Sequence, residues 1–327
     1  MRTCILLWLL MALPALAAEP PAPTWRQWDL DFTVDGQAIP LRIRAPAEPH
    51  GPCPVILFSH GLAGAREGYD HFTATWAAAG FFVVQPSHPG SDTNAFRSAG
   101  LAGLSDAMHR AVLDPQVAAS RPKLISRLID LLPQVQAAAI GWQGTLDAAH
   151  IGVAGHSFGA WTAQAVSGVR FRLADGTKTV ADPRPVAFIA LSPSGSGPLQ
   201  PPDAWDHTSR PMLFITGTED VMPAFLTRPG DAPRDLTWRE QAFRRVPAGG
   251  QYFAVFAGAH HCAFSMGQGA RLTGEPLPEP WIEPALLALT TTWWRAQLCA
   301  DPTALAEVQG GTAVPADARS RVRWEAR

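Results

Sequence analysis

Residues 150–160 read His150-Ile151-Gly152-Val153-Ala154-Gly155-His156-Ser157-Phe158-Gly159-Ala160. A short apolar run leads into Gly-His-Ser-Phe-Gly, and small residues with a spacing that suits a helix follow it. This order is typical of a strand, a sharp turn that exposes a nucleophile, and a helix. The two glycines suit so tight a turn because a Cβ at either position would collide with neighbouring backbone. We therefore expect Ser157 at the end of a strand, above a helix N-terminus whose free N–H groups would stabilise an oxyanion.

The rest of the chain alternates between predicted strands and predicted helices. Continuous apolar runs, typical of strands buried on both faces, cover residues 54–58, 81–84, 186–191, 212–216 and 252–256. Helices are predicted at residues 66–79, 122–140, 157–166, 238–245 and 281–298. Alternating patterns on both sides of Asp35-Gly36 predict an antiparallel N-terminal hairpin. The sequence therefore predicts an α/β fold, in which a mostly parallel central sheet begins with this hairpin and carries helices on both faces.

The N-terminus has the three parts of a secretory signal peptide. Arg2 precedes an apolar run at residues 4–13, and Pro14 and small residues follow the run. The run is shorter than the roughly 20 apolar residues that cross a bilayer, so we expect no stable membrane span. Cleavage after Ala17 or Ala18 would leave an exported protein, periplasmic or secreted, with an uncleaved N-terminal anchor as the alternative. The signal peptide is assigned to residues 1–18 and one catalytic domain to 19–300, and the tail at 301–327 is unassigned.

Composition and charge exclude several kinds of partner. A hydrophobic fraction of 47% describes an ordinary globular protein, and a net charge of −2 favours neither nucleic acid nor an anionic membrane surface as a partner. The histidines and cysteines lack the spacing of a zinc site, and His260-His261-Cys262 are too close together to converge on one ion. We therefore expect no metal and no cofactor. The sequence does not indicate an oligomeric state.

Three cysteines remain after the predicted cleavage, namely Cys53, Cys262 and Cys299. Export permits disulfides, but an odd number of cysteines leaves at least one thiol free. We expect a Cys262–Cys299 bond, because it would tie a functional loop to the last helix. Three separate buried thiols are the alternative.

Polar candidates for chemistry follow three of the predicted strands. Ser157 follows the short apolar run that contains Ile151 and Val153, Asp220 follows residues 212–216, and His261 follows residues 252–256. Reactive groups gather at the carboxyl ends of parallel strands, so these side chains should lie close together. A serine hydroxyl needs an imidazole to take its proton, and the imidazole needs a carboxylate to orient it and stabilise its cation. The residue types and the order Ser, Asp, His therefore predict a hydrolytic triad.

Two of these roles have a competing neighbour in the sequence. Glu219 adjoins Asp220, which we prefer because its shorter side chain suits a tight turn. His260 and His261 compete for the role of base. Further histidines near the strand ends are expected to form hydrogen bonds in loops, and these are His60, His88 and His156.

A second donor to the oxyanion should come from the loop after residues 54–58. This loop reads His60-Gly61-Leu62. We expect the backbone N–H groups of Leu62 and Phe158 to form the oxyanion hole.

Taken together, these segments resemble the α/β-hydrolase superfamily, and most of all its bacterial dienelactone-hydrolase-like branch, which is related to platelet-activating-factor acetylhydrolases. The resemblance covers roughly residues 29–298, and Gly155-His156-Ser157-Phe158-Gly159 is its most specific part. It implies an α/β-hydrolase fold, with Ser157 as nucleophile, Asp220 as acid and His261 as base. In relatives, a small residue often stands two positions after the base, and an aromatic residue follows it directly. His261-Cys262-Ala263-Phe264 fits that register, and His260 does not.

The function expected from this resemblance is that of an exported serine hydrolase, which cleaves carboxylic esters through an acyl-enzyme. Dienelactone hydrolases use a cysteine nucleophile, so the serine here favours ordinary esters, with a small-molecule or lipid ester as substrate. Residues 93–121 and 222–236 depart most from a minimal hydrolase and are expected to form a lid or the wall of an acyl pocket. An amidase or peptidase on the same triad is one alternative. A non-catalytic binding module is another, because fold alone does not give function.

Overall fold

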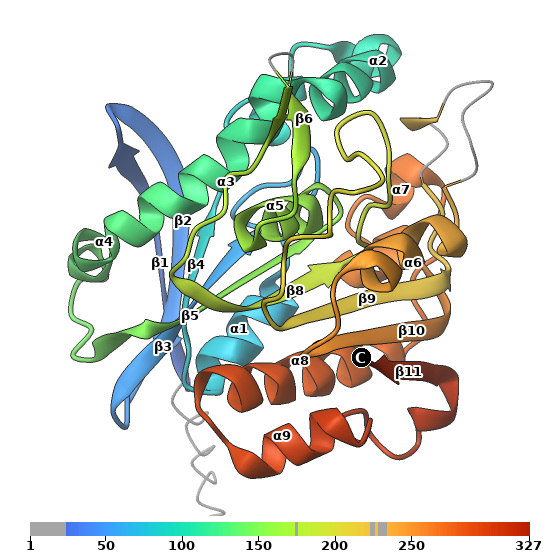
Figure 1. Ribbon diagram of the computed structural model, residues 1–327. Helices are drawn as coiled ribbons and strands as arrows, with labels where there is room; N and C mark the ends of the chain where they lie inside the picture. The colour runs from blue at the N-terminus through green and yellow to red at the C-terminus, as the bar shows by residue number, and fades with distance from the viewer. Residues whose placement is uncertain (1–23, 174–175, 223–225, 228–233) are drawn as a thin grey trace, which may run out of the picture.

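The computed structural model describes residues 24–173, 176–222, 226–227 and 234–327 (Figure 1). The predicted signal peptide at residues 1–18 lies outside the described residues. In the described part of the chain, no helix is both long enough and apolar enough to cross a membrane.

A mixed sheet runs through the middle of the molecule. Within the described residues its nine strands lie in the order β1-β2-β4-β3-β5-β8-β9-β10-β11. The six strands from β4 to β10 are parallel to one another, and β1, β2 and β11 run antiparallel to their neighbours. The strands are β1 Trp25–Val34, β2 Gln37–Pro46, β3 Pro52–Ser59, β4 Phe82–Pro86, β5 Thr145–His156, β8 Pro185–Leu191, β9 Met212–Glu219, β10 Gln251–His260 and β11 Val322–Ala326. A separate hairpin joins β6 Phe171–Leu173 and β7 Gly176–Lys178.

Helices cover both faces of the sheet, as Figure 1 shows. One face packs against α3, α4, α5 and α6, and the other packs against α1, α8 and α9. The helices are α1 Asp70–Ala78, α2 Gly100–Leu113, α3 Pro115–Asp130, α4 Leu132–Ala138, α5 Phe158–Ser167, α6 Leu236–Arg245, α7 Ala270–Thr273, α8 Ile282–Leu298 and α9 Pro302–Gln309, with the 3-10 helices η1 Thr93–Phe96, η3 His261–Ser265 and η4 Arg319–Arg321. The arrangement confirms the predicted mostly parallel sheet, its N-terminal hairpin and the helices on both faces.

The central strands are apolar throughout because each supplies both cores. In β3, Val55 and Leu57 enter the core under α3 and α5, whereas Ile56 and Phe58 enter the core under α1 and α8. Successive side chains of a strand point to opposite faces, so a strand between two helical layers needs apolar residues at every position. At the N-terminal hairpin, both residues of the Asp35-Gly36 turn have positive φ, 48° and 82°, as the predicted tight turn requires.

Two segments differ from the sequence-based expectation. The helix predicted at 122–140 is two helices, α3 and α4, which meet at Leu131 just before Pro133. The tail left unassigned at 301–327 contains α9 and β11, and β11 pairs antiparallel with β10. The alternation in Val322-Arg323-Trp324-Glu325-Ala326 covers only five residues, and the backbone partner of this strand lies about 70 residues away in the chain.

The expected Cys262–Cys299 disulfide is wrong, since Cys53, Cys262 and Cys299 are all free thiols. The two cysteines that were expected to pair lie at opposite ends of the sheet. Cys262 follows the carboxyl end of β10, whereas Cys299 ends α8 and lines a cavity with Cys53 at the amino end of β3.

Candidate active site

Ser157 lies on the sharp turn between β5 and α5. Its backbone has φ 56° and ψ −114°, a conformation that a residue with a side chain adopts only when its surroundings enforce it. The flanking glycines permit this turn, because a Cβ on Gly159 would overlap the carbonyl oxygen of Ser59, and a Cβ on Gly155 would overlap that of Gly159. The Ser157 N–H is held by the carbonyl oxygen of Leu191, 2.9 Å away.

The structure brings Ser157, His261 and Asp220 together in one chain of hydrogen bonds. The Ser157 Oγ lies 2.9 Å from His261 Nε2, and His261 Nδ1 lies 2.9 Å from Asp220 Oδ1. The hydroxyl of Thr216 donates to Asp220 Oδ2 over 2.8 Å. His261 and Asp220 follow the adjacent strands β10 and β9, and Ser157 follows β5, so parallel strand ends converge as expected.

Glu219 and His260, the sequence neighbours that compete with Asp220 and His261, lie outside this chain of hydrogen bonds. The Glu219 side chain is exposed at the end of β9. His260 pairs through Nδ1 with the Glu275 carboxylate, 3.2 Å away. Adjacent residues of an extended backbone point in opposite directions, so only one member of each pair can reach Ser157.

Asp220 is fully buried and stays ionised. Burial alone would raise the pKa of its carboxyl group, but the Arg239 guanidinium and the hydrogen bond to His261 outweigh burial and hold the pKa below its usual range. Arg239 Nη2 lies 3.0 Å from Asp220 Oδ1. Sequence reasoning missed Arg239. The available signal was its place on the buried face of α6, where Ala242 and Phe243 follow at the i+3 and i+4 positions.

Leu62 and Phe158, the two residues predicted to supply oxyanion donors, line the space around Ser157. Phe158 begins α5, and Leu62 lies in the loop after β3. Among the described residues, neither the Leu62 N–H nor the Phe158 N–H donates a hydrogen bond to another group of the protein. Unpaired N–H groups next to a serine are suited to binding the negative oxygen that forms when a carbonyl carbon is attacked.

A buried arginine supports the loop that carries Leu62. Arg121, on α3, donates to the carbonyl oxygen of His60 and to the hydroxyls of Ser59 (3.0 Å), Ser91 (2.7 Å) and Thr162 (3.0 Å). Burial lowers the pKa of Arg121 to about 9. The five residues come from β3 and the loop after it, from α3 and α5, and from the loop after β4. No local pattern in the sequence marks their contact.

The histidines expected in loops are buried and hydrogen bonded. His60 Nε2 accepts from the His88 N–H over 3.0 Å, and His88 Nε2 lies 2.9 Å from the Ser59 hydroxyl. His156 Nδ1 lies 2.8 Å from the hydroxyl of Tyr69, and His156 Nε2 lies 3.1 Å from the carbonyl oxygen of His261. Burial lowers the pKa of His60 to about 3, and burial also holds the pKa of His88 and of His156 well below the ordinary value.

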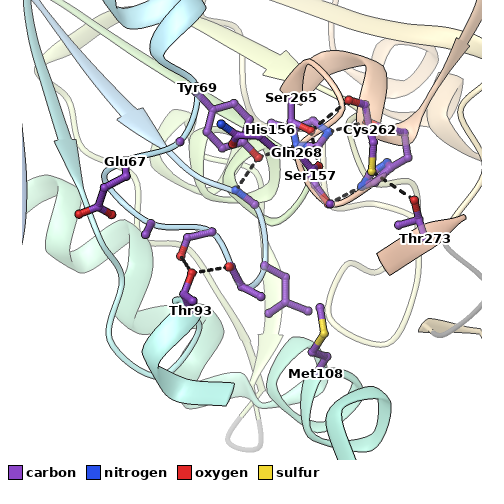
Figure 2. A pocket seen from close by; sticks show the side chains of 18 of the residues that line it. Glu67, Tyr69, Thr93, Met108, His156, Ser157, Cys262, Ser265, Gln268 and Thr273 are labelled. Carbon is purple, nitrogen blue, oxygen red and sulfur yellow. Dashed lines mark hydrogen bonds between the residues drawn. The ribbon is translucent and has the colours of Figure 1, made fainter. Parts of the chain in front are cut away.

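Two cavities meet at Ser157. The first, of about 410 Å³, lies on the side of His261, and Figure 2 shows it with Thr93 from η1 and Met108 from α2 in its wall. The second, of about 90 Å³, is lined on the other side by Phe158 and Trp161. Both cavities are also lined by Leu62 and Leu226.

The two regions expected to form a lid or pocket wall contribute to both cavities. Met108 lines the first cavity, and Leu113 and Met222 line the second. Much of the segment 222–236 lies outside the described residues, at 223–225 and 228–233.

Comparison with known families agrees with the resemblance. Residues 25–107 match the family model described as platelet-activating factor acetylhydrolase, isoform II. The match confirms the predicted similarity over that stretch, and the sheet order is that of the α/β-hydrolase fold. The matched stretch includes the loop of Leu62 and ends before Ser157. The match therefore supports a hydrolase that acts on esters, but it does not cover the candidate nucleophile. No curated protein matches the chain.

Proposed function

We propose that this protein is an exported serine hydrolase that cleaves carboxylic esters through an acyl-enzyme. The observation that carries the proposal is the continuous chain of hydrogen bonds from Ser157 through His261 to the buried carboxylate of Asp220, beside two unpaired backbone N–H groups. The similarity of residues 25–107 to an acetylhydrolase family supports an ester as the substrate.

Each group has one role in the proposed reaction. His261 Nε2 takes the proton from Ser157 as Oγ attacks the ester carbonyl carbon. The Leu62 and Phe158 N–H groups bind the oxygen that becomes negative, and Asp220 stabilises the imidazolium. The imidazolium then gives its proton to the alcohol that leaves. Water, deprotonated by His261, attacks the acyl-enzyme and releases the acid.

The two cavities suggest how the ester lies in the site. His261 must reach the oxygen of the leaving alcohol, so the alcohol belongs in the larger cavity, of which His261 forms part. The acyl group then belongs in the smaller cavity beside Phe158 and Trp161. Its volume of about 90 Å³ suits a short acyl chain.

A series of p-nitrophenyl esters, from acetyl to palmitoyl, tests the proposal. We expect the wild-type protein to hydrolyse the short-chain esters, and Ser157→Ala to lose at least about 10³-fold in kcat/KM. Ser167→Ala is the matched control, since Ser167 is buried in the same helix α5 and bonds only to backbone and hydroxyl groups away from the cavities. Equal rates for wild type and Ser157→Ala would refute the nucleophile. Comparable rates on p-nitroanilides would favour an amidase instead.

Export is a separate part of the proposal and rests on residues 1–18. Expression of the full chain in a Gram-negative host, followed by cell fractionation and intact-mass measurement, tests it. A periplasmic or secreted product that begins after Ala17 or Ala18 is the expected result, and an uncleaved product in the membrane fraction would indicate an anchor.

A further inference from the structure

Arg239 is a buried arginine in direct contact with the proposed acid and base. Its side chain is 1% exposed and enters the site from α6. Nη1 donates to the carbonyl oxygens of Ser192 (3.1 Å) and Pro193 (3.3 Å), and Nε donates to that of Asp220 (3.3 Å). These bonds fix the plane of the guanidinium and leave Nη2 directed at the carboxylate.

Nη2 of Arg239 and Nδ1 of His261 share one acceptor. Each lies close to Asp220 Oδ1, at 3.0 Å and 2.9 Å, and the two nitrogens are themselves 3.0 Å apart. Both carry hydrogens when His261 acts as base through Nε2, so neither can accept from the other, and Oδ1 accepts from both. The carboxylate is therefore divided between a permanent cation and the imidazole.

We propose that Arg239 is a positioning residue for ester hydrolysis, which holds the Asp220 carboxylate in line with His261 and limits how strongly that carboxylate favours the protonated imidazole. The inference rests on the proposed function. Without Arg239, the full negative charge of Asp220 would act on the ring. The base would then protonate at higher pH and would be held less firmly.

Other charged and titratable groups around the ring are distributed over several elements. His156, at the end of β5, packs against the His261 ring with centroids 4.8 Å apart. Glu275 bonds to the backbone N–H of Cys262 and pairs with His260. Arg234 precedes α6 and acts on Arg239 electrostatically. Among these groups, His156 is held neutral by burial, and Glu275 is engaged with its own partners.

The test compares two substitutions of Arg239 by the pH dependence of kcat/KM on p-nitrophenyl acetate. Arg239→Met removes the charge and should move the acid limb upward by roughly one pH unit or more, with a plateau lower by on the order of tenfold. Arg239→Lys keeps the charge, so its acid limb should stay near that of the wild type. An unmoved acid limb in Arg239→Met, or a moved one in Arg239→Lys, would overturn the inference.

Arg44→Met is the matched control. Arg44 is also a buried arginine, 2% exposed and paired with a carboxylate, Asp70 at 2.7 Å, but it lies in β2 outside both cavities. The Arg44→Met variant should lose thermal stability, and the acid limb of its kcat/KM profile should stay where it is in the wild type. In an Asp220→Asn background, Arg239→Met should add little further loss, because the arginine acts through that carboxylate. Full additivity of the two losses would count against the inference.

A measurement independent of turnover separates this inference from the proposed function. The downfield proton resonance of the His261 ring, assigned by its absence in His261→Gln, can be titrated in wild type and in both Arg239 variants. Its titration should move upward in Arg239→Met whatever the substrate is. Should Arg239→Met fail to fold, Arg239→Gln takes its place, because it also removes the charge but keeps hydrogen-bond donors for the surrounding carbonyl oxygens. An unmoved titration in Arg239→Gln would then overturn the inference. Absence of esterase activity together with the expected titration would refute the proposed function alone.

Discussion

At the scale of single residues, Tyr69 joins the loop of the proposed oxyanion hole to the proposed base. The Gly61 N–H donates to the Tyr69 hydroxyl over 3.2 Å, and this hydroxyl donates to His156 Nδ1 over 2.8 Å. His156 in turn donates through Nε2 to the carbonyl oxygen of His261 over 3.1 Å. The direction of these bonds follows from the last one, because a carbonyl oxygen can only accept. Nε2 of His156 therefore carries the hydrogen, and Nδ1 of the neutral ring accepts from the Tyr69 hydroxyl.

Tyr69→Phe breaks this connection in the middle. The change leaves a buried N–H group and a buried ring nitrogen without partners, so we expect a loss of about 1–3 kcal/mol in the free energy of unfolding. Esterase activity should fall as well, since both ends of the connection lie in the site. Urea unfolding and p-nitrophenyl acetate hydrolysis measure the two effects.

The second tyrosine of the chain is the control for this change. In the part of the chain that the structure describes, the hydroxyl of Tyr252 has no hydrogen-bond partner, and its ring packs against Trp293 and Trp324. Tyr252→Phe should therefore be close to neutral. A loss in Tyr252→Phe as large as that in Tyr69→Phe would show that the ring substitution, and not the broken connection, is responsible.

At the scale of elements, the first turn of α5 is packed against the end of β3. Gly159 is where the two backbones meet, because a Cβ there would overlap the carbonyl oxygen of Ser59 and approach that of His60 to 2.9 Å. The same contact sets the distance between Phe158 and the loop that carries Leu62. The spacing of the two proposed oxyanion donors is thus a property of how a helix and a strand pack.

Gly159→Ala tests this contact, with Gly103→Ala in α2 as the matched change. Overlap with backbone that cannot move should cost Gly159→Ala about 1–3 kcal/mol or more and most of its activity. At Gly103 the nearest atom to a new Cβ is 4.0 Å away, so Gly103→Ala should gain about 0.5–1 kcal/mol from helix propensity. Thermal unfolding of both variants gives the comparison. Stabilisation by both changes would contradict the proposed contact.

At the scale of the whole molecule, buried neutral histidines make stability depend on pH. Burial lowers the pKa of His60 to about 3 and holds the pKa of His88 and of His156 well below the ordinary value. In the unfolded chain, histidine takes up its proton near pH 6.5. Below that pH the unfolded state binds more protons than the folded state, so the folded state loses stability as the pH falls.

The expected slope can be measured by urea unfolding between pH 7.5 and 5. Below about pH 6.5, each such histidine should cost about 1.4 kcal/mol of unfolding free energy per pH unit. Substitution of one of them, as in His88→Asn, should reduce the slope by about that amount, whatever it does to stability at pH 7.5. An unfolding free energy that stays constant over this range would show that these histidines are protonated in the folded protein.

The sequence predicted the elements of the fold wherever a local pattern carried the information. Apolar runs marked the central strands because the two cores demand apolar side chains on both faces of the sheet. The break at Leu131 has a local cause, because Pro133 lies in the first turn of α4 and cannot continue the preceding helix. Strand β11 escaped prediction for a different reason, since it depends on pairing with a strand far away in the chain.

By itself, then, the sequence determined the α/β architecture and the three side chains at the strand ends that the structure brings within hydrogen-bonding distance of one another. Only the tertiary structure decided that Cys262 and Cys299 lie at opposite ends of the sheet, and that Arg121, Arg239 and Tyr69 support the site. A strand end is a local feature, because hydrophobic periodicity and a turn motif locate it. A buried arginine or tyrosine hydroxyl is stable only where distant segments supply its partners, so its role follows from contacts that no stretch of sequence contains.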